Sequence, residues 1–295
     1  MSTQLKQLWR SLTMLVVTIA AVPAVSAECT PIDTAPTVIS ASGHYCLVND
    51  VSLSDARGTA ITIDSPEVVV DLQGFEMRGP HYGGLTTIPS SVAIRANNVG
   101  NITIRNGRIS GFGTGVRLDS SLPLQSGNLV ENLHIDGNSL LGIQVRTAET
   151  IVRDNRITGL DARLQSGTMA GVVWGIYSEN IWGLGFGNQI LRNSITGFRG
   201  QNGTTGSAGM RLQRASDTLI EGNYIQSTSP SAAYWGISIT HSHNVTVLAN
   251  RLHRLAYGID YQNIAANTSG TYGNNVTERV SFPYRGVGTD IGNNF

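Results

Sequence analysis

A short unit, Asn-x-Ile or Asn-x-Leu, recurs in the second half of the sequence and constrains the fold more than any other feature. Each copy is followed, after a gap of variable length, by Gly, an aliphatic residue, a variable residue and usually another aliphatic residue. Segments this short cannot each bury a hydrophobic face, but stacked copies bury a continuous core. The repeat therefore predicts a solenoid of short strands. Its asparagines are Asn155, Asn193, Asn223 and Asn250.

The Gly-aliphatic segments have the alternation of β-strands, in which the aliphatic residues face the core and the variable residue faces outward. Two earlier stretches, Ile61–Ile63 and Val92–Ile94, fit the pattern without the Gly and bring the total to about eight coils. Stacked asparagines form hydrogen-bonded ladders, and parallel crossovers are almost always right-handed. The expected fold is all-β: a right-handed, single-stranded parallel β-helix of about eight coils.

These motifs resemble those of the right-handed parallel β-helix repeat family, the pectate-lyase-like superfamily, over roughly residues 58–262. The resemblance implies the fold and leaves the activity open, although members often process acidic polysaccharides. The sequence lacks the neighbouring Asp pair and Gly-His-Gly of polygalacturonases, the Asp-Pro-His-Asp of alginate epimerases and the clustered Asp calcium site of pectate lyases. No catalytic residue of the family can therefore be assigned to a position here.

The first 27 residues are typical of a secretory signal. Lys6 and Arg10 precede an apolar run that is too short to span a membrane, and Val25-Ser26-Ala27 is a suitable cleavage site. The alternative is an uncleaved anchor. After removal of the signal, we expect no membrane span and a periplasmic or secreted protein.

The mature chain divides into a β-helix over residues 58–262 and two capping segments. Residues 28–57 are expected to cap the first coil and to carry a Cys29–Cys46 disulfide, because an exported chain meets an oxidising compartment. Two free thiols or a metal pair are the alternatives. Residues 263–295 form the expected C-terminal cap or tail.

Charge and composition exclude several functions. The sequence has 20 basic and 20 acidic residues. It therefore lacks the excess of basic residues that would point to a nucleic-acid partner. Its single lysine, Lys6, lies in the expected signal, which excludes a lysine base or Schiff base. We predict no cofactor and no metal, and we expect a monomer.

Residues at equivalent positions of stacked strands form outward columns. One column begins with five residues of alternating charge, which favours a structural ion ladder over a substrate-binding strip. Its members are Asp64, Arg95, Asp119, Arg146, Glu179, Gln213, Thr240 and Gln262.

The neighbouring column contains Tyr177, Arg211 and Asp260 and lies under the longest insertions, which are expected to wall a groove. Trp174 and Trp235 precede the Gly of their coils, where the rings either stack on sugars or close a corner of the core. His241 and His243 follow the strand between Arg211 and Asp260. Their His-x-His spacing is more typical of a turn than of a metal site.

Two functional hypotheses follow. In the first, the chain binds an extracellular or envelope polysaccharide, or is a structural envelope component, and Trp174, Tyr177, Arg211, Trp235 and Asp260 contact the substrate. In the second, it is a polysaccharide lyase or uronate C5-epimerase acting on an acidic glycan, which requires a base and neutralisation of the enolate. Arg211 would neutralise the charge, and His241, His243 or Tyr177 would exchange the proton, with Asp260 as a further candidate.

Overall fold

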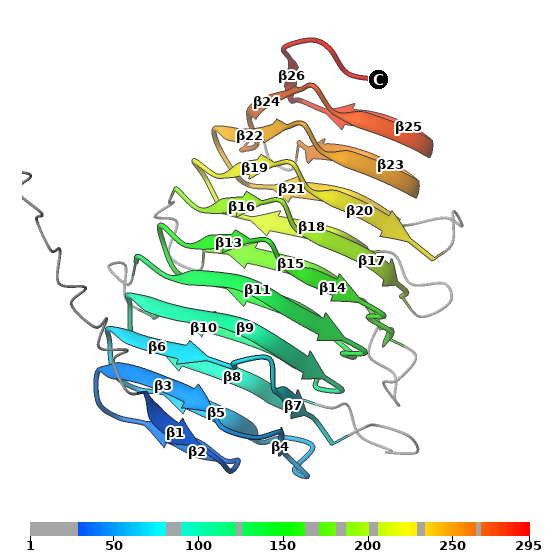
Figure 1. The fold of residues 1–295 in the computed structure, drawn as a ribbon. Coiled ribbons are helices and arrows are strands. Elements are labelled where there is room, and N and C mark those ends of the chain that lie inside the picture. The colour runs from blue at the N-terminus through cyan, green and yellow to red at the C-terminus, as the bar shows by residue number, and fades with distance from the viewer. Residues whose placement is uncertain are drawn as a thin grey trace, which may run out of the picture.

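The computed structural model describes residues 29–80, 90–121, 126–162, 171–180, 187–200, 206–228, 234–263 and 267–295. Figure 1 shows an elongated stack of coils that rises from β1 to β26. All strand pairings among the described residues are parallel, and the strands form three faces, which we call faces A, B and C. The predicted right-handed parallel β-helix is confirmed. In the described part of the chain, no helix has the length and hydropathy that a membrane crossing requires.

Face A is formed by the Gly-aliphatic segments and their neighbours at either end. Its strands, in stacking order, are β2 (Thr37–Ile39), β5 (Thr59–Ile63), β8 (Val92–Asn97), β10 (Thr114–Asp119), β12 (Leu141–Val145), β15 (Trp174–Glu179), β18 (Ser207–Gln213), β21 (Tyr234–Thr240), the end of β23 (Arg251–Gln262) and the end of β25 (Val276–Gly286).

Face B follows face A along the chain. Its strands are β1 (Thr30–Ile32), β3 (Gly43–Leu47), β6 (Val68–Asp71), the start of β9 (Ile102–Ser110), the start of β11 (Leu129–Asp136), β13 (Ile151–Arg153), β16 (Gln189–Leu191), β19 (Leu219–Glu221), β22 (Val245–Leu248), β24 (Gly270–Gly273) and β26 (Thr289–Asp290).

Face C contains the Asn-x-Ile units and completes each coil. Its strands are β4 (Val51–Ser52), β7 (Glu76–Arg78), the ends of β9 and β11, β14 (Arg156–Thr158), β17 (Ser194–Phe198), β20 (Tyr224–Ser227) and the starts of β23 and β25.

Face A extends beyond the predicted coils at both ends. The eight segments that define the prediction correspond to β5, β8, β10, β12, β15, β18, β21 and β23, while β2 and β25 add one strand at either end. Strands β1 to β4 lie within residues 28–57, and β24 to β26 lie within residues 263–295. Both terminal segments therefore pair in parallel with the solenoid.

The register of β8 differs from the expected one by two residues. The sequence aligns Val92–Ile94 with Ile61–Ile63, whereas the structure pairs Ile61 with Ile94 and Thr62 with Arg95. The physical reason is that Val92, Ile94 and Ala96 are all buried, so that a shift by one full alternation also keeps apolar side chains inside. Arg95 therefore lies in the column of Arg117, not in the column of Asp119.

The Gly that begins the Gly-aliphatic segments has a steric reason. A Cβ atom at Gly175 would lie 2.5 Å from the carbonyl oxygen of Gly209 and 2.6 Å from Cγ2 of Ile195. Face A passes so close to face C at this corner that only a hydrogen fits. The residues that follow, Ile176, Met210 and Ile237, are fully buried in register with one another.

The predicted asparagine ladder is confirmed and is longer than expected. Asn155 donates from its backbone N–H and its Nδ2 to Oδ1 of Asn193 at 3.1 and 3.0 Å. The same contacts link Asn193 to Asn223 and Asn223 to Asn250. The ladder then continues through Asn275 and Asn294. The repeated units are therefore superposed along the solenoid.

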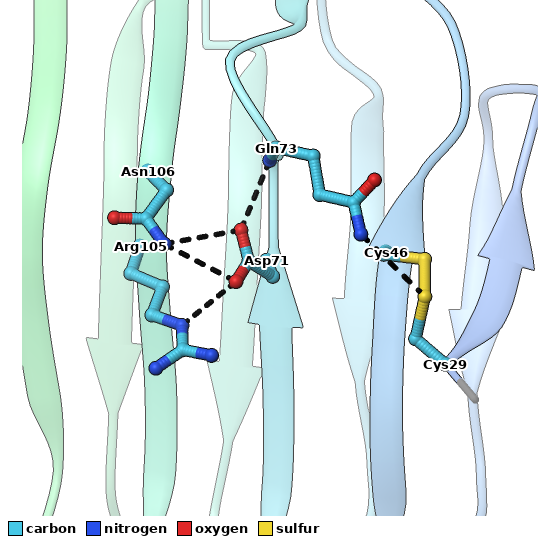
Figure 2. Close-up of a disulfide and its surroundings, with 6 residues drawn as sticks. All are labelled: Cys29, Cys46, Asp71, Gln73, Arg105 and Asn106. Carbon is cyan, nitrogen blue, oxygen red and sulfur yellow. Dashed lines mark hydrogen bonds and ion pairs between the residues drawn. A yellow bond between two sulfur atoms is a disulfide. The ribbon is translucent and has the colours of Figure 1, made fainter. Parts of the chain in front are cut away.

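Near the N-terminal end, Cys29 and Cys46 form the expected disulfide, with Cα atoms 5.7 Å apart. Figure 2 shows Gln73 beside it, with Nε2 donating to Sγ of Cys29 at 3.7 Å. On the next coil, the carboxylate of Asp71 accepts hydrogen bonds from Arg105 at 2.9 Å and from Asn106 at 3.2 Å (Figure 2). The disulfide and this polar cluster connect the first coils of face B.

Candidate functional site

The outward surface of face A carries a column of aromatic rings over its last coils. Trp235, Tyr257 and Phe282 are in register on β21, β23 and β25. Their rings stack, with centroids 5.1 and 5.3 Å apart and interplanar angles of 17° in both pairs. On the preceding coil the column is interrupted by Ala208, and Trp174 lies one strand further back.

The tryptophan side chains lie outside the core. Trp235 donates from Nε1 to Oδ2 of Asp260 at 2.9 Å, and the ring of Trp174 lies 4.5 Å from the ring of Tyr177. Tyr177 and Asp260 alternate with the core residues Ile176 and Ile259 on their strands, so they face outward. The geometry decides against the interpretation that these rings fill a corner of the core.

A polar column runs beside the rings. Tyr177, Arg211, Ser238, Asp260 and Arg285 occupy equivalent positions on five successive strands from β15 to β25. The structure therefore brings the predicted Tyr177, Arg211 and Asp260 onto one strip, together with Trp174 and Trp235. We call this strip, from Trp174 to Arg285, the face A strip.

Arg211 is held against an aromatic ring and has a donor without a partner. Its guanidinium carbon lies 5.3 Å from the centroid of Trp174, within the range of a cation–π contact. Its Nε is buried and forms no hydrogen bond with the described residues. Because a buried unpaired donor is costly, this group is suited to receive an acceptor from a ligand.

Asp260 is a fully buried carboxylate on the same strip. Its Oδ2 accepts hydrogen bonds from Trp235 and from Nε2 of Gln262, the latter at 3.1 Å. Its Oδ1 makes no hydrogen bond with the described residues and lies 3.6 Å from Nε of Arg285. Arg285 in turn lies over Tyr257, with its guanidinium carbon 5.1 Å from the ring centroid. The strip thus has a buried acceptor and a buried donor that make no hydrogen bond with the described residues.

Tyr177 is poorly suited to act as a base. Only 6% of the residue is exposed, and burial, followed by the negative charge of Glu179, raises the pKa of its hydroxyl well above the ordinary value. The hydroxyl donates a hydrogen bond to Oε1 of Gln213 at 3.3 Å. Tyr177 is therefore protonated at neutral pH.

The two histidines are not joined to the strip. His241 and His243 lie on the turn after β21, and their backbone N–H groups donate to Thr268 at 2.9 Å and Ser216 at 3.0 Å. Within the described residues, no hydrogen bond or ion pair connects either histidine to Arg211 or Asp260. Nδ1 of His241 is buried without a hydrogen bond to the residues that the structure describes.

Several residues of the strip were missed by the sequence patterns. Phe282 and Arg285 lie within the expected tail, where the coil lacks both the Asn-x-Ile unit and the Gly-aliphatic segment. Asn275, which continues the ladder, is the signal that could have identified this extra coil.

The predicted ion ladder is present in part, since Arg146 pairs with Glu179 at 2.8 Å and with Asp119 at 3.6 Å. Arg95 joins it diagonally, 3.1 Å from Asp119.

With the geometry established, comparison with known proteins identifies the family. The model of the family described as periplasmic copper-binding protein (NosD) matches residues 49–252, more than half of the chain. The chain belongs to the NosD family. Its expected membership of a right-handed parallel β-helix family is thereby confirmed. Among curated proteins, none matches this sequence.

Solved structures resemble this NosD family member at low sequence identity. XylC, solved in complex with xylose, has a TM-score of 0.53 and 16% identity over 75% of this chain and 37% of its own. The tailspike protein 2 domain of bacteriophage CBA120 has a TM-score of 0.49 and 14% identity, over 90% of this chain and 39% of its own. An alginate lyase from Paenibacillus has a TM-score of 0.48 and 14% identity, over 85% of this chain and 90% of its own. The chain thus spans about two fifths of the first two proteins, and at such identities the likeness concerns the fold alone.

The residues of this NosD family member that the structure describes do not bring together the ligands of a copper site. Copper prefers thiolate, thioether and imidazole ligands, but both cysteines are in the disulfide. Met77 and Met210 are fully buried in the core. In the ranges that the structure describes, no three His, Cys, Asp or Glu side chains are grouped so that they could hold a metal ion. We therefore assign no role to copper.

Proposed function

We propose that this NosD family member is exported and binds a polysaccharide along the face A strip. The observation that carries the proposal is the stacked column of Trp235, Tyr257 and Phe282 beside Arg211 and Asp260, which each have a polar atom without a hydrogen bond to the described residues. Sugar rings combine apolar C–H faces with hydroxyl groups, and aromatic and polar groups placed together are complementary to both. Phe282, with 55% of its surface exposed, offers apolar contact area at one end.

Export to an oxidising compartment is part of the same proposal. The Cys29–Cys46 disulfide and the periplasmic description of the family support it, as does the secretory pattern of residues 1–27. The binding surface would then face envelope or extracellular glycans.

Binding is a better supported function than lyase or epimerase chemistry. Arg211 could neutralise a uronate carboxylate, but Tyr177 holds its proton at neutral pH and the histidines are not joined to the strip. Among the described residues that the strip brings together, only Asp260 remains as a proton acceptor, and it is already bonded to Trp235 and Gln262.

A glycan array followed by calorimetric titration of the best ligand tests the proposal. Trp235→Ala and Arg211→Ala should each weaken binding about tenfold or more, because anchors in partly desolvated sites typically contribute at least about 1.4 kcal/mol. Gln189→Ala replaces an outward-facing residue on face B, and this variant should bind the glycan with wild-type affinity.

Two outcomes contradict the proposal. If no glycan binds, or if both strip variants retain wild-type affinity, the strip is not a polysaccharide site. Unsaturated or epimerised products from a uronic acid polymer, lost in Arg211→Ala, would instead favour the catalytic alternative.

A further inference from the structure

A separate candidate site lies on face C, near the C-terminal end of the solenoid. A shallow pocket of about 140 Å³ is formed where β20, β23 and β25 lie side by side. Its volume suits a single small group and not a polymer. It is lined by Tyr224, Arg251, Leu252, His253, Val276 and Glu278.

Two polar side chains of this pocket have no hydrogen-bond partner among the described residues. Nε2 of His253 is buried and makes no hydrogen bond with them. The guanidinium group of Arg251 forms no hydrogen bond or ion pair with any described residue, although Arg251 and His253 lie on the same outward side of β23. A planar guanidinium group binds carboxylates through two parallel hydrogen bonds. The pocket therefore offers a pair of donors to an anionic oxygen group.

The other polar groups of the pocket are compatible with this assignment. The hydroxyl of Tyr224 already donates to Oε1 of Gln226 at 2.6 Å, so its ring serves as a wall. Oε1 of Glu278 lies 3.7 Å from Nε2 of His253, beyond hydrogen-bond distance. Because the Glu278 side chain is 69% exposed, it can move aside when an incoming carboxylate takes its place.

We propose that this pocket binds the carboxylate group of a small organic acid or of an acidic sugar unit through Arg251 and His253. Glu278 occupies the same region as a weak internal competitor. The site lies on a different face from the face A strip, so it goes beyond the proposed polysaccharide binding and does not depend on it.

Titration followed by NMR of the histidine side chain tests the proposal. D-glucuronate and D-glucose form a matched pair that differs in the carboxylate, and succinate is an acid without a sugar ring. The His253 ring resonances, assigned with His253→Asn, should shift in a saturable manner with glucuronate and remain unchanged with glucose. A matching shift with succinate would identify the carboxylate alone as the ligand, whereas a response to glucuronate only would identify an acidic sugar.

The glucuronate affinity of single variants shows which side chains of the pocket contribute to binding. Arg251→Gln should weaken glucuronate binding at least about tenfold, since a hydrogen bond to a charged group typically contributes about 1.5 kcal/mol or more. Glu278→Gln should strengthen it about threefold by removing the competitor. Arg156→Gln removes an exposed arginine of the same column, three strands away, and should have no effect.

Equal shifts with glucose, absence of saturable shifts, or wild-type affinity in Arg251→Gln would overturn the proposal.

Discussion

Asp71 illustrates how a single residue couples the stability of this solenoid to pH. Burial pushes the pKa of its carboxyl group upward, but hydrogen bonds from the backbone of Gln73 and from Asn106 and Arg105 outweigh burial and lower the pKa below its ordinary value. A carboxyl group with a lowered folded-state pKa stabilises the fold fully above the unfolded-state pKa. That contribution is lost as the pH falls through the folded-state value.

Asp71→Asn should therefore destabilise the protein at pH 7 by about 1 kcal/mol, because the cluster is only partly buried and solvent screens its charges. The difference from the wild type should shrink as the pH falls below about 4. Urea unfolding followed by circular dichroism across this pH range measures the effect. Asp64→Asn, at an exposed position without a side-chain hydrogen bond to the described residues, is the control, and a pH-independent difference for Asp71→Asn would contradict the linkage.

At the scale of elements, the asparagine ladder shows what the sequence can predict. The amide of Asn193 bonds both neighbouring coils and also donates to the carbonyl oxygen of Val152 at 2.9 Å. Because this geometry needs an asparagine at a fixed distance from a buried aliphatic residue, the sequence repeats the spacing and the ladder could be predicted. The extension to Asn275 was missed because Thr277 replaces the aliphatic residue of the unit.

The register of the candidate site was predictable for the same reason. Arg211 and Asp260 each follow the core residue after a Gly, so their positions on face A follow from the period of two. The histidines lie on a turn instead, where His241 adopts a left-handed conformation with φ of 51°. A turn of this kind has no fixed period, and the direction of its side chains could not be predicted.

Replacing Asn193 tests how strongly the ladder couples the coils. Asn193→Ala leaves the N–H of Asn155 and the carbonyl oxygen of Val152 without partners in the core, which should cost about 3 kcal/mol. The exposed Asn263→Ala should be neutral within about 0.5 kcal/mol. Urea unfolding measures the stability of both variants. Equal stability of the two variants would show that water replaces the missing amide.

At the scale of the whole molecule, the parallel β-helix distributes stability along its axis. Each coil contacts only the coils before and after it, so a local change is expected to loosen nearby coils first. The aliphatic core ends in aromatic side chains at the C-terminal end, where the hydroxyl of Tyr261 lies 2.9 Å from the carbonyl oxygen of Val245 and the rings of Tyr272 and Tyr284 stack at 4.9 Å. The N-terminal end has the disulfide instead.

Removing the disulfide should therefore act locally. The double variant Cys29→Ser, Cys46→Ser should lose about 3 kcal/mol of stability in the first coils, because the disulfide links two residues that are 17 positions apart in the sequence. Hydrogen exchange measured by mass spectrometry should accelerate in β1 to β4 and remain unchanged in β18 to β23. Uniform acceleration along the chain would show that the solenoid unfolds as one cooperative unit.

The in-register stacking of face A also bears on how such a protein could change its partner over evolutionary time. Since all coils present equivalent backbones to their neighbours, duplicating or deleting one coil would leave the remaining hydrogen-bond pattern intact. The separation between two anchoring side chains, such as Arg211 and Arg285, would then change in whole steps of about 4.8 Å. A lineage could thereby adjust to a ligand with a different repeat length without redesigning the interior.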